Sequence, residues 1–167
     1  TSTLSAETRQ VVGSRPVFDF SVTAGGSQIS TFGSGSASVS IPYTLKAGED
    51  AAAVVVYYID NSGNLQTVRG AYNDSTKSVD FIAAHFSRYA VGYNALSFTD
   101  VRSGAWYDSA VTFCAARGIT TGTTDTAFSP DKAVTRGQFI VMLLRAYGIE
   151  PDSNPADNFA DAGNTYY

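Results

Sequence analysis

The chain has 167 residues, of which 44% are hydrophobic and 16% are charged, so it is long and apolar enough to fold as one domain or two small ones. Its net charge of −4 is spread along the chain without a basic stripe, which argues against binding to nucleic acid. No apolar run approaches the roughly 20 residues that a membrane span requires. One cysteine and one histidine exclude an internal disulfide and the usual zinc sites, and we expect no metal and no cofactor.

The sequence has no initiator methionine and no signal-peptide pattern, so we expect it to be part of a longer protein. Its many Gly, Tyr, Phe, Ser and Thr residues, together with few Lys, are typical of extracellular β-rich proteins. The composition therefore favours an exported protein.

The residues before position 95 predict a β-rich domain. Short runs rich in Val, Ile, Tyr, Phe and Thr are separated by turn formers at spacings near ten residues, which is typical of an antiparallel sandwich or barrel. The run 36–44 alternates apolar and polar residues, as a half-buried strand does. By contrast, 53–59 is apolar throughout, as expected of a central strand covered on both faces. The predicted strands are 15–23, 28–32, 36–44, 53–60, 65–69, 78–82 and 88–93, with a turn around 72–75 and the end of a helix within 1–12.

A first helix is predicted after position 95. Trp106, Ala110 and Arg117 fall at helical spacing. Ser103 is a possible N-cap, and Gly118 stands where a glycine commonly ends a helix. The Trp106 ring either packs in the core or offers a flat face to a sugar, and a lone Trp at helical spacing favours the core.

A second helix is predicted to begin at Thr135 and to end at Gly148 and Pro151. The Thr135 hydroxyl can accept a hydrogen bond from the Gln138 amide while the Gln138 side chain reaches back, which forms a capping box. The loop 119–130 connects the two helices, and its apolar residues are expected to reach the core.

The chain also contains the start of an internal repeat. FTDV at 98–101 is echoed by FADA at 159–162, and the aromatic pair at 106–107 is echoed at 166–167. Repeats of this length stack on their neighbours, so we expect neighbouring repeats to complete the functional unit.

Residues 98–149 resemble the S-layer homology family through five elements: an F-x-D-V opening, a Trp before an amphipathic helix, G-I-x-x-G, F-x-P and a T-R-x-x helix start. The N-terminal part resembles the β module that often precedes such repeats in bacterial surface proteins, through VSIPYTL, VVYYID and HFSRYAVGY. The resemblance implies an α+β fold in three parts. These are an antiparallel β-sandwich over 1–95, a helix-loop-helix S-layer homology module over 96–150, and a linker with the start of a second repeat over 151–167.

This resemblance implies a non-catalytic attachment role at the cell wall or S-layer of a bacterium with a Gram-positive type of wall. Such modules typically act in threes and hold secondary cell wall polysaccharide, often through a pyruvylated sugar. The family's T-R-A-E motif reads Thr135-Arg136-Gly137-Gln138 here, so Arg136 takes the place of the anion-binding arginine. Because Gly and Gln replace the Ala and Glu of the family motif, the motif does not determine which glycan is preferred. The G-I-x-x-G loop borders the ligand groove in the family, which makes Gly122 a candidate contact.

The residues themselves place an anion at the same position. The first amides after Thr135 lack helical partners, the helix dipole is positive there, and the Arg136 guanidinium suits a carboxylate. In the alternative interpretation Arg136 is a solvated residue or pairs with Asp131. The predicted glycan-binding set is therefore Arg136 and Thr135, with Gly122 and Trp106 as further contacts. Asp100 is expected to orient the loop before the first helix, and the acidic residues lack the regular spacing of a calcium loop.

Two other functions stay open. In the first, the chain is the anchor of an exported polysaccharide-degrading enzyme whose catalytic domain lies outside this sequence. In the second, the β module itself binds glycan, which an exposed aromatic platform would favour, or cleaves itself at His85-Phe86-Ser87, which resembles the H-F-S site of self-cleaving domains and would need a strained turn. The strand-like residues on both sides favour a structural hydrogen bond for His85. No pair of carboxylates is singled out for hydrolysis, so we expect no enzymatic activity in this chain.

Overall fold

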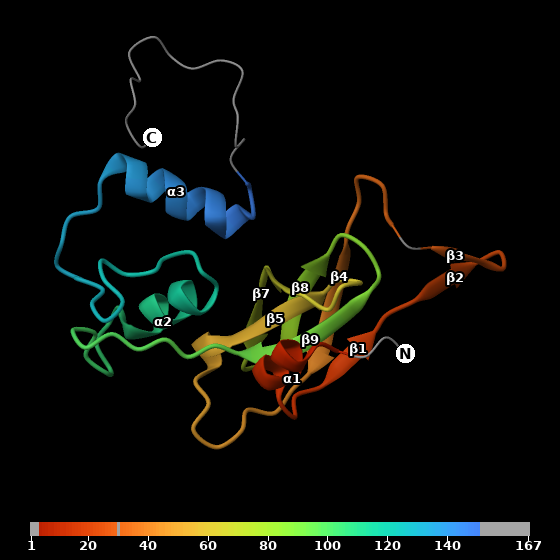
Figure 1. Cartoon of the computed structure of the whole chain (residues 1–167), viewed down its shortest axis with the longest axis horizontal. Coiled ribbons are helices and arrows are strands. Elements are labelled where there is room, and N and C mark those ends of the chain that lie inside the picture. The colour runs from red at the N-terminus through yellow and green to blue at the C-terminus, as the bar shows by residue number, and fades with distance from the viewer. Residues whose placement is uncertain (1–3, 30, 151–167) are drawn as a thin grey trace, which may run out of the picture.

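The computed structural model describes residues 4–29 and 31–150. It is an α+β structure with a β-rich N-terminal part, as predicted, followed by a helical part (Figure 1). Within the described ranges no helix has the length and apolar character needed to cross a membrane. The elements are α1 (Ala6–Val12), β1 (Val17–Asp19), β2 (Val22–Ala24), β3 (Ser27–Ile29), β4 (Ala37–Pro42), η1 (Ala51–Ala53), β5 (Val54–Ile59), β6 (Leu65–Val68), β7 (Gly70–Asn73), β8 (Ser78–Ala83), β9 (Arg88–Tyr93), α2 (Asp108–Ala116) and α3 (Arg136–Tyr147).

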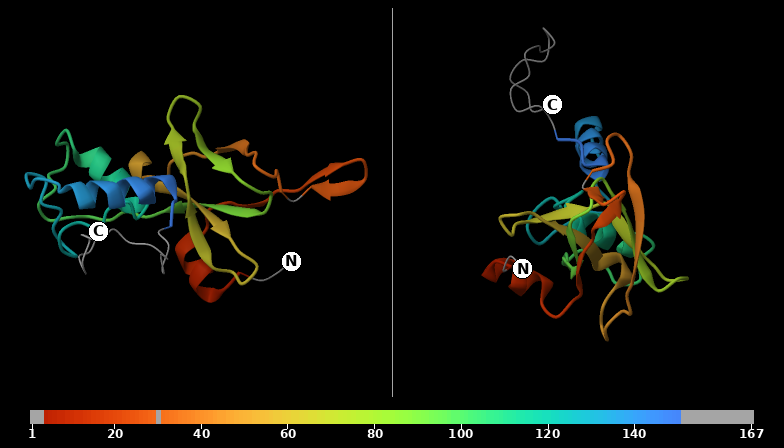
Figure 2. Two further views of the ribbon diagram at one scale, coloured as in Figure 1. Left: turned by 90° about the horizontal axis from the view of Figure 1, so that it is seen from above. Right: turned by 90° about the vertical axis from the view of Figure 1, so that its right-hand side faces the viewer.

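The strands form three antiparallel sheets. A four-stranded sheet has the order β1-β9-β5-β6, a three-stranded sheet has the order β4-β8-β7, and β2 pairs with β3 as a hairpin. Both larger sheets contribute to one core. Its buried residues are Ile41, Tyr43, Val54, Val56, Val79, Phe81, Ala83, Tyr89 and Val91. In Figures 1 and 2 the helical part lies at one end of these sheets and the β2–β3 hairpin at the other.

The two strands with the clearest sequence patterns are confirmed. β5 lies between β9 and β6, and Val54, Val55 and Val56 are each at most 1% exposed. Val54 and Val56 face the shared core, whereas Val55 packs with Ala116 of α2, so both faces of β5 are covered. β4 alternates between exposed and less exposed residues, with Ile41 buried.

Two strand predictions need correction. The predicted strand 15–23 is interrupted, because the chain leaves the four-stranded sheet after β1 and enters the β2–β3 hairpin, whose turn uses positive φ at Gly25 and Gly26. The predicted turn around 72–75 starts too early. β7 runs through Asn73 and pairs with β8, and the Asn73 side chain then accepts the amide of Ser75 at 3.1 Å to open the turn.

The helix ends differ in how well the sequence predicts them. Thr135 caps α3, and Gly148 ends it in the left-handed conformation at φ +65°, as predicted. Ser103 does not cap α2, which begins five residues later with Tyr107 at its N-cap position and no side-chain cap. The Asp108 carboxylate instead accepts the Gly104 amide at 2.8 Å, which folds the preceding turn back onto the helix start. The predictions for Pro151 and for the repeat at 159–167 lie outside the described residues.

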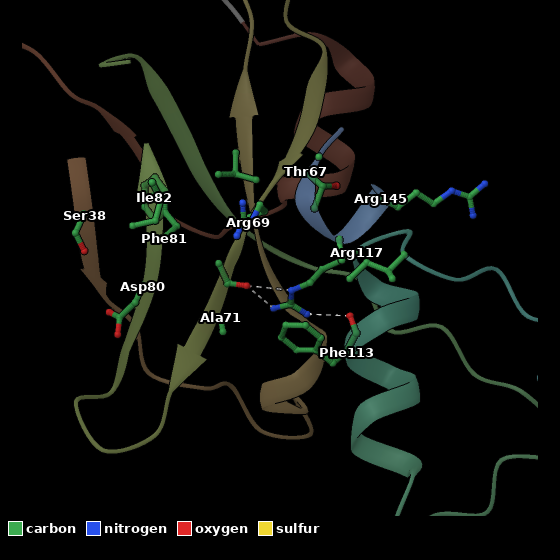
Figure 3. Close-up of a pocket in the computed structure, with 15 residues that line it drawn as sticks. Ser38, Thr67, Arg69, Ala71, Asp80, Phe81, Ile82, Phe113, Arg117 and Arg145 are labelled. Atoms are coloured by element: carbon green, nitrogen blue, oxygen red, sulfur yellow. Dashed lines mark hydrogen bonds between the residues drawn. The ribbon is translucent and has the colours of Figure 1, made fainter. Parts of the chain in front are cut away.

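Arg117, the residue that follows α2, joins the helical part to the sheets (Figure 3). Its guanidinium donates to the carbonyls of Ala52 and Val54 at 2.8 Å each, and twice to that of Gly70 at 3.0 and 2.9 Å. A fifth bond reaches the Phe113 carbonyl, and the guanidinium carbon lies 3.6 Å from the centroid of the Phe113 ring. All five N–H donors of the guanidinium are therefore in use. Burial lowers the pKa of Arg117 to about 10, which leaves it charged at neutral pH.

Candidate functional site

The start of α3 combines a satisfied cap with open amides. The Gln138 amide donates to Thr135 Oγ1 at 3.2 Å, and the Thr135 amide donates to Gln138 Oε1 at 3.0 Å, so the predicted capping box is confirmed. The amides of Arg136 and Gly137 donate to no other described residue. These two N–H groups carry a partial positive charge and lie at the N-terminus of α3, where the helix dipole favours an anion.

Arg136 is the first residue of α3 and is exposed. Ion pairs in the part of the chain that the structure describes join Arg15 to Glu49 and Lys77 to Asp74. The alternative pairing of Arg136 with Asp131 is not formed there. The Arg136 guanidinium is thus left for solvent or a ligand, next to the two open amides.

A hollow of about 300 Å³ lies beside α3, and we call it the loop pocket. Gly122, from the loop that follows α2, and Gln138, from the capping box, both line it. The loop pocket therefore lies between the loop that contains Gly122 and the residue that completes the Thr135 capping box. Arg136 and Trp106 are not among the residues that line the loop pocket.

Gly122 holds a backbone position that only glycine fits. Its φ is +78°, and a Cβ placed on it would lie 2.6 Å from the Ala127 carbonyl oxygen and 2.7 Å from the Phe98 ring. Real Cβ atoms are not found so close to backbone oxygens, so any side chain at this position must displace the loop. Glycine here shapes the loop pocket whether or not it touches a ligand.

We expect Gly122→Ala to lower the free energy of unfolding by about 1–3 kcal/mol more than Gly118→Ala does. Gly118 is the matched control, because its φ of +67° imposes similar backbone strain while a Cβ placed on it would meet nothing within 4 Å. Urea unfolding of both variants measures the difference. Equal destabilisation would show that the close contacts around Gly122 carry no energetic weight.

Asp100 holds the other end of this loop, which follows α2, whereas the sequence predicted that it orients the loop before the first helix. Its two carboxylate oxygens accept the amides of Phe128 at 2.8 Å and Ser129 at 2.7 Å. The Phe128 amide, and after it the Ser129 amide, hold the pKa of Asp100 below its ordinary value. The rings of Phe98 and Phe128 lie 5.7 Å apart, and the Thr99 amide donates to the Thr126 carbonyl at 2.8 Å, so the loop is held by a carboxylate, an aromatic contact and a backbone hydrogen bond.

Acidification should loosen this loop. Because the folded pKa of Asp100 is lowered, its contribution is present above the ordinary Asp pKa of about 3.9 and is lost as the pH falls through the lower folded value. We expect the hydrogen-exchange protection of the Phe128 and Ser129 amides to fall between about pH 5 and about pH 2.5. In Asp100→Asn the protection should be weaker at the upper end of this range and should change less across it. An identical pH profile in both proteins would contradict the role of Asp100.

Trp106 is not a core residue, and this sequence prediction was wrong. Trp106 is 93% exposed, and its ring contacts that of Tyr107 edge-on, with ring centroids 5.6 Å apart. The reason is that α2 begins at Asp108, so Trp106 precedes the helix and does not share the buried face formed by Val111 and Ala115. Stacking of Trp106 on a sugar stays a prediction.

His85 lies at an isolated β-bridge with Thr31. Its ring packs edge-on against Tyr58, with centroids 4.7 Å apart, and its carbonyl accepts the Tyr89 hydroxyl at 2.9 Å. These contacts agree with a structural role for His85 at a strand edge. Self-cleavage at this site stays an untested alternative.

A larger cleft of about 490 Å³ lies between the sheets and the helices (Figure 3), and we call it the junction cleft. Its lining comes from β4, β6, β7 and β8 on one side and from α2 and α3 on the other. Sequence reasoning missed this cleft and the role of Arg117, because both arise where segments far apart in the chain meet. A single arginine at the end of a predicted helix gives no local signal of such contacts.

The family model of the S-layer homology domain matches residues 97–140. This segment is an S-layer homology domain. The domain is a non-catalytic anchoring module and, together with surface proteins among the relatives, it locates the protein at the bacterial cell surface. No solved structure matches the chain.

Three relatives illustrate where such domains occur. An amylopullulanase of Thermoanaerobacterium thermosulfurigenes is 33% identical over 116 residues, or 70% of this chain and 6% of the relative. An endoglucanase of a Bacillus species (strain KSM-635) is 39% identical over 74 residues, or 44% of this chain and 8% of the relative. A cell surface protein of Thermoanaerobacter kivui is 44% identical over 73 residues, or 43% of this chain and 10% of the relative. The chain thus spans a tenth or less of the length of these relatives.

The match to the amylopullulanase is too long to fit within residues 97–167 alone. It therefore includes part of the β-rich region. The two parts that Arg117 joins in the structure also occur together in that relative.

Proposed function

We propose that the chain attaches its parent protein to the bacterial cell wall by binding an acidic secondary cell wall polysaccharide at the start of α3. The observation that carries this proposal is the group formed by the exposed Arg136 guanidinium and the open amides of Arg136 and Gly137, within an S-layer homology domain. A planar guanidinium and backbone amides together suit a carboxylate.

The pyruvyl group of a pyruvylated sugar would supply that carboxylate. Thr135 fixes the direction of the amides through its capping box. The loop pocket shaped by Gly122 has room for part of a neighbouring sugar residue, and the exposed ring of Trp106 offers an apolar face to another. Neighbouring S-layer homology repeats are the expected protein partners.

For the domain organisation we propose residues 1–95 as a β-sandwich module that serves as a spacer or assembly surface, 96–150 as the anchoring module and 151–167 as the linker and start of a second repeat. We interpret the two larger sheets, which share one core, as the two layers of a β-sandwich. The two helices and their loop correspond to the helix-loop-helix part of the module. No catalytic residue is assigned to this chain.

A second candidate concerns the parent protein. The amylopullulanase relative matches part of the β-rich region as well as the helical part, so the whole unit can accompany a polysaccharide-degrading enzyme. In this candidate the chain is the wall anchor of such an enzyme, with its catalytic domain in another part of the protein. The chemistry proposed for α3 is the same in both cases.

Co-sedimentation with purified sacculi of the producing bacterium tests the proposal. We expect the chain to sediment with native sacculi and to stay in solution with sacculi stripped of secondary polysaccharide. If the chain alone does not sediment, a longer chain that carries the following repeats is tested in the same way. Equal binding to native and stripped sacculi, or no binding by the longer chain, would contradict a polysaccharide anchor.

A further inference from the structure

The junction cleft has the size and lining of a ligand site. Its volume of about 490 Å³ falls within the range of about 300–1,000 Å³ found for small-molecule sites, which often lie between domains and have mainly apolar walls with a few polar groups. Phe81 and Ile82 of β8 and Phe113 of α2 form apolar parts of the wall, and the Ile82 side chain is 54% exposed. No described segment of the chain fills this space.

The charge of the cleft is opposite to that of the chain. Three arginines line it, namely Arg69, Arg117 and Arg145, against the single carboxylate of Asp80. The whole chain has a net charge of −4. A concentration of positive charge in an acidic protein favours an anionic occupant.

Asp80 does not neutralise these arginines. Its carboxylate accepts hydrogen bonds from Ser40 at 2.6 Å, Ser78 at 2.7 Å and Asn73 at 3.0 Å. The Ser40 hydroxyl, followed by the Ser78 hydroxyl and the Asn73 side-chain amide, holds the pKa of Asp80 below its ordinary value. The carboxylate is therefore satisfied on its own side of the sheet.

Two of the three arginines have guanidinium N–H donors that form no hydrogen bond within the described part of the chain. Arg117 uses all of its donors on carbonyl groups. Arg69 and Arg145 are not buried, and neither guanidinium donates a hydrogen bond or forms an ion pair within the described part of the chain. Arg69 lies over the Tyr147 ring, 5.1 Å from its centroid, which holds its charged group between β7 and α3. In Figure 3 Arg145 extends outward from α3 at the edge of the cleft.

The junction cleft adjoins the loop pocket. Ile119 and Arg145 line both spaces. Arg145 therefore lies between the hollow lined by Gly122 and Gln138 and the cleft lined by Arg69 on the β-rich part. An occupant of the loop pocket that is long enough would pass next to Arg145 and reach the β-rich part.

We infer that the junction cleft is a second subsite for an acidic polysaccharide, with Arg69 and Arg145 contacting its carboxylates and the apolar wall packing against its sugar rings. This inference rests on the proposed function and extends it, because it gives the β-rich part a share in glycan binding. A polymer that repeats its acidic unit can occupy both subsites at once. The second contact is then intramolecular, and overall binding becomes tighter than either contact alone.

The test uses the whole chain and soluble polysaccharide released from native sacculi. Arg69→Gln and Arg145→Gln each remove one positive charge, and Arg102→Gln is the matched control because Arg102 is exposed and does not line either space. We expect each cleft variant to bind about 3–10-fold more weakly and the double variant more than about tenfold, with Arg102→Gln unchanged. Thermal unfolding of each variant checks that the fold is retained.

NMR gives a second measurement that does not depend on a variant. Addition of the released polysaccharide should shift the amide signals of Ala71 and Gly148, which line the cleft. If the wild-type chain binds through Arg136 but both cleft variants bind like the control and these signals do not move, the second subsite is wrong while the proposed function stands. If a glutamate-rich peptide shifts the same signals and the polysaccharide does not, the cleft serves an acidic protein segment and the inference is overturned. If none of these proteins binds the polysaccharide, the same variants are measured in the longer chain that carries the following repeats, and failure there too would contradict the proposed function itself.

Discussion

Arg136→Ala is expected to weaken binding to native wall polysaccharide by about 10–100-fold. This magnitude follows from the loss of charge-assisted hydrogen bonds to a carboxylate, worth about 1.5–3 kcal/mol. The fold should be retained, because Arg136 is exposed and forms no ion pair with a described residue. Thr135 and Gln138 would still cap α3. Co-sedimentation over a range of sacculus concentrations measures the change.

Arg102→Ala is the control for Arg136→Ala. Arg102 is also exposed, but it precedes α2 and has no part in the start of α3. We expect it to bind like the wild-type chain. If both variants lose affinity equally, binding depends on overall charge and Arg136 has no special role.

The second large effect is on stability. We expect Arg117→Met to lower the free energy of unfolding by about 3 kcal/mol or more, and the melting temperature by about 6–12 °C. Methionine keeps much of the apolar stem but donates no hydrogen bond. The carbonyls of Ala52, Val54 and Gly70 would then lose their side-chain donor where the two parts of the chain meet.

The same substitution should loosen the contact between the two parts of the chain. Limited proteolysis measures this, because cleavage in the connecting segment near Leu96, which is 47% exposed, should become faster in Arg117→Met. Arg117→Lys is the matched variant, since lysine keeps the charge but replaces the planar fork with a point donor. We expect it to fall between wild type and Arg117→Met. Unchanged stability and unchanged cleavage in Arg117→Met would show that the parts are held together by other contacts.

Much of the fold follows from local patterns in the sequence. The uninterrupted apolar run of β5 predicts a covered central strand, and the Thr135–Gln138 spacing predicts the start of α3, because each depends on residues close together in the chain. The role of Asp100 was predicted only in part, because its carboxylate does accept loop amides, but those of Phe128 and Ser129 after α2 rather than those of the loop before it.

Other features depend on tertiary contacts that no local pattern contains. The exposure of Trp106 follows from where α2 begins, and helix ends are poorly specified when no side chain caps them. The turn predicted after β7 starts too early, because Tyr72 packs against the core and extends the strand. The junction cleft needs residues from four strands and two helices, so it becomes visible only when these elements are placed together.

The most direct test of acidic-glycan recognition is a calorimetric titration of the chain, extended by its following repeats if needed, with released wall polysaccharide before and after amidation of its carboxylates. Amidation removes the negative charge and leaves the sugar backbone in place. We predict measurable binding of the native polymer and a loss of affinity of about tenfold or more after amidation, because the Arg136 guanidinium and the open amides of α3 would lose their anionic partner. Equal affinity for the two polymers would contradict the central claim that this surface recognises an acidic wall glycan.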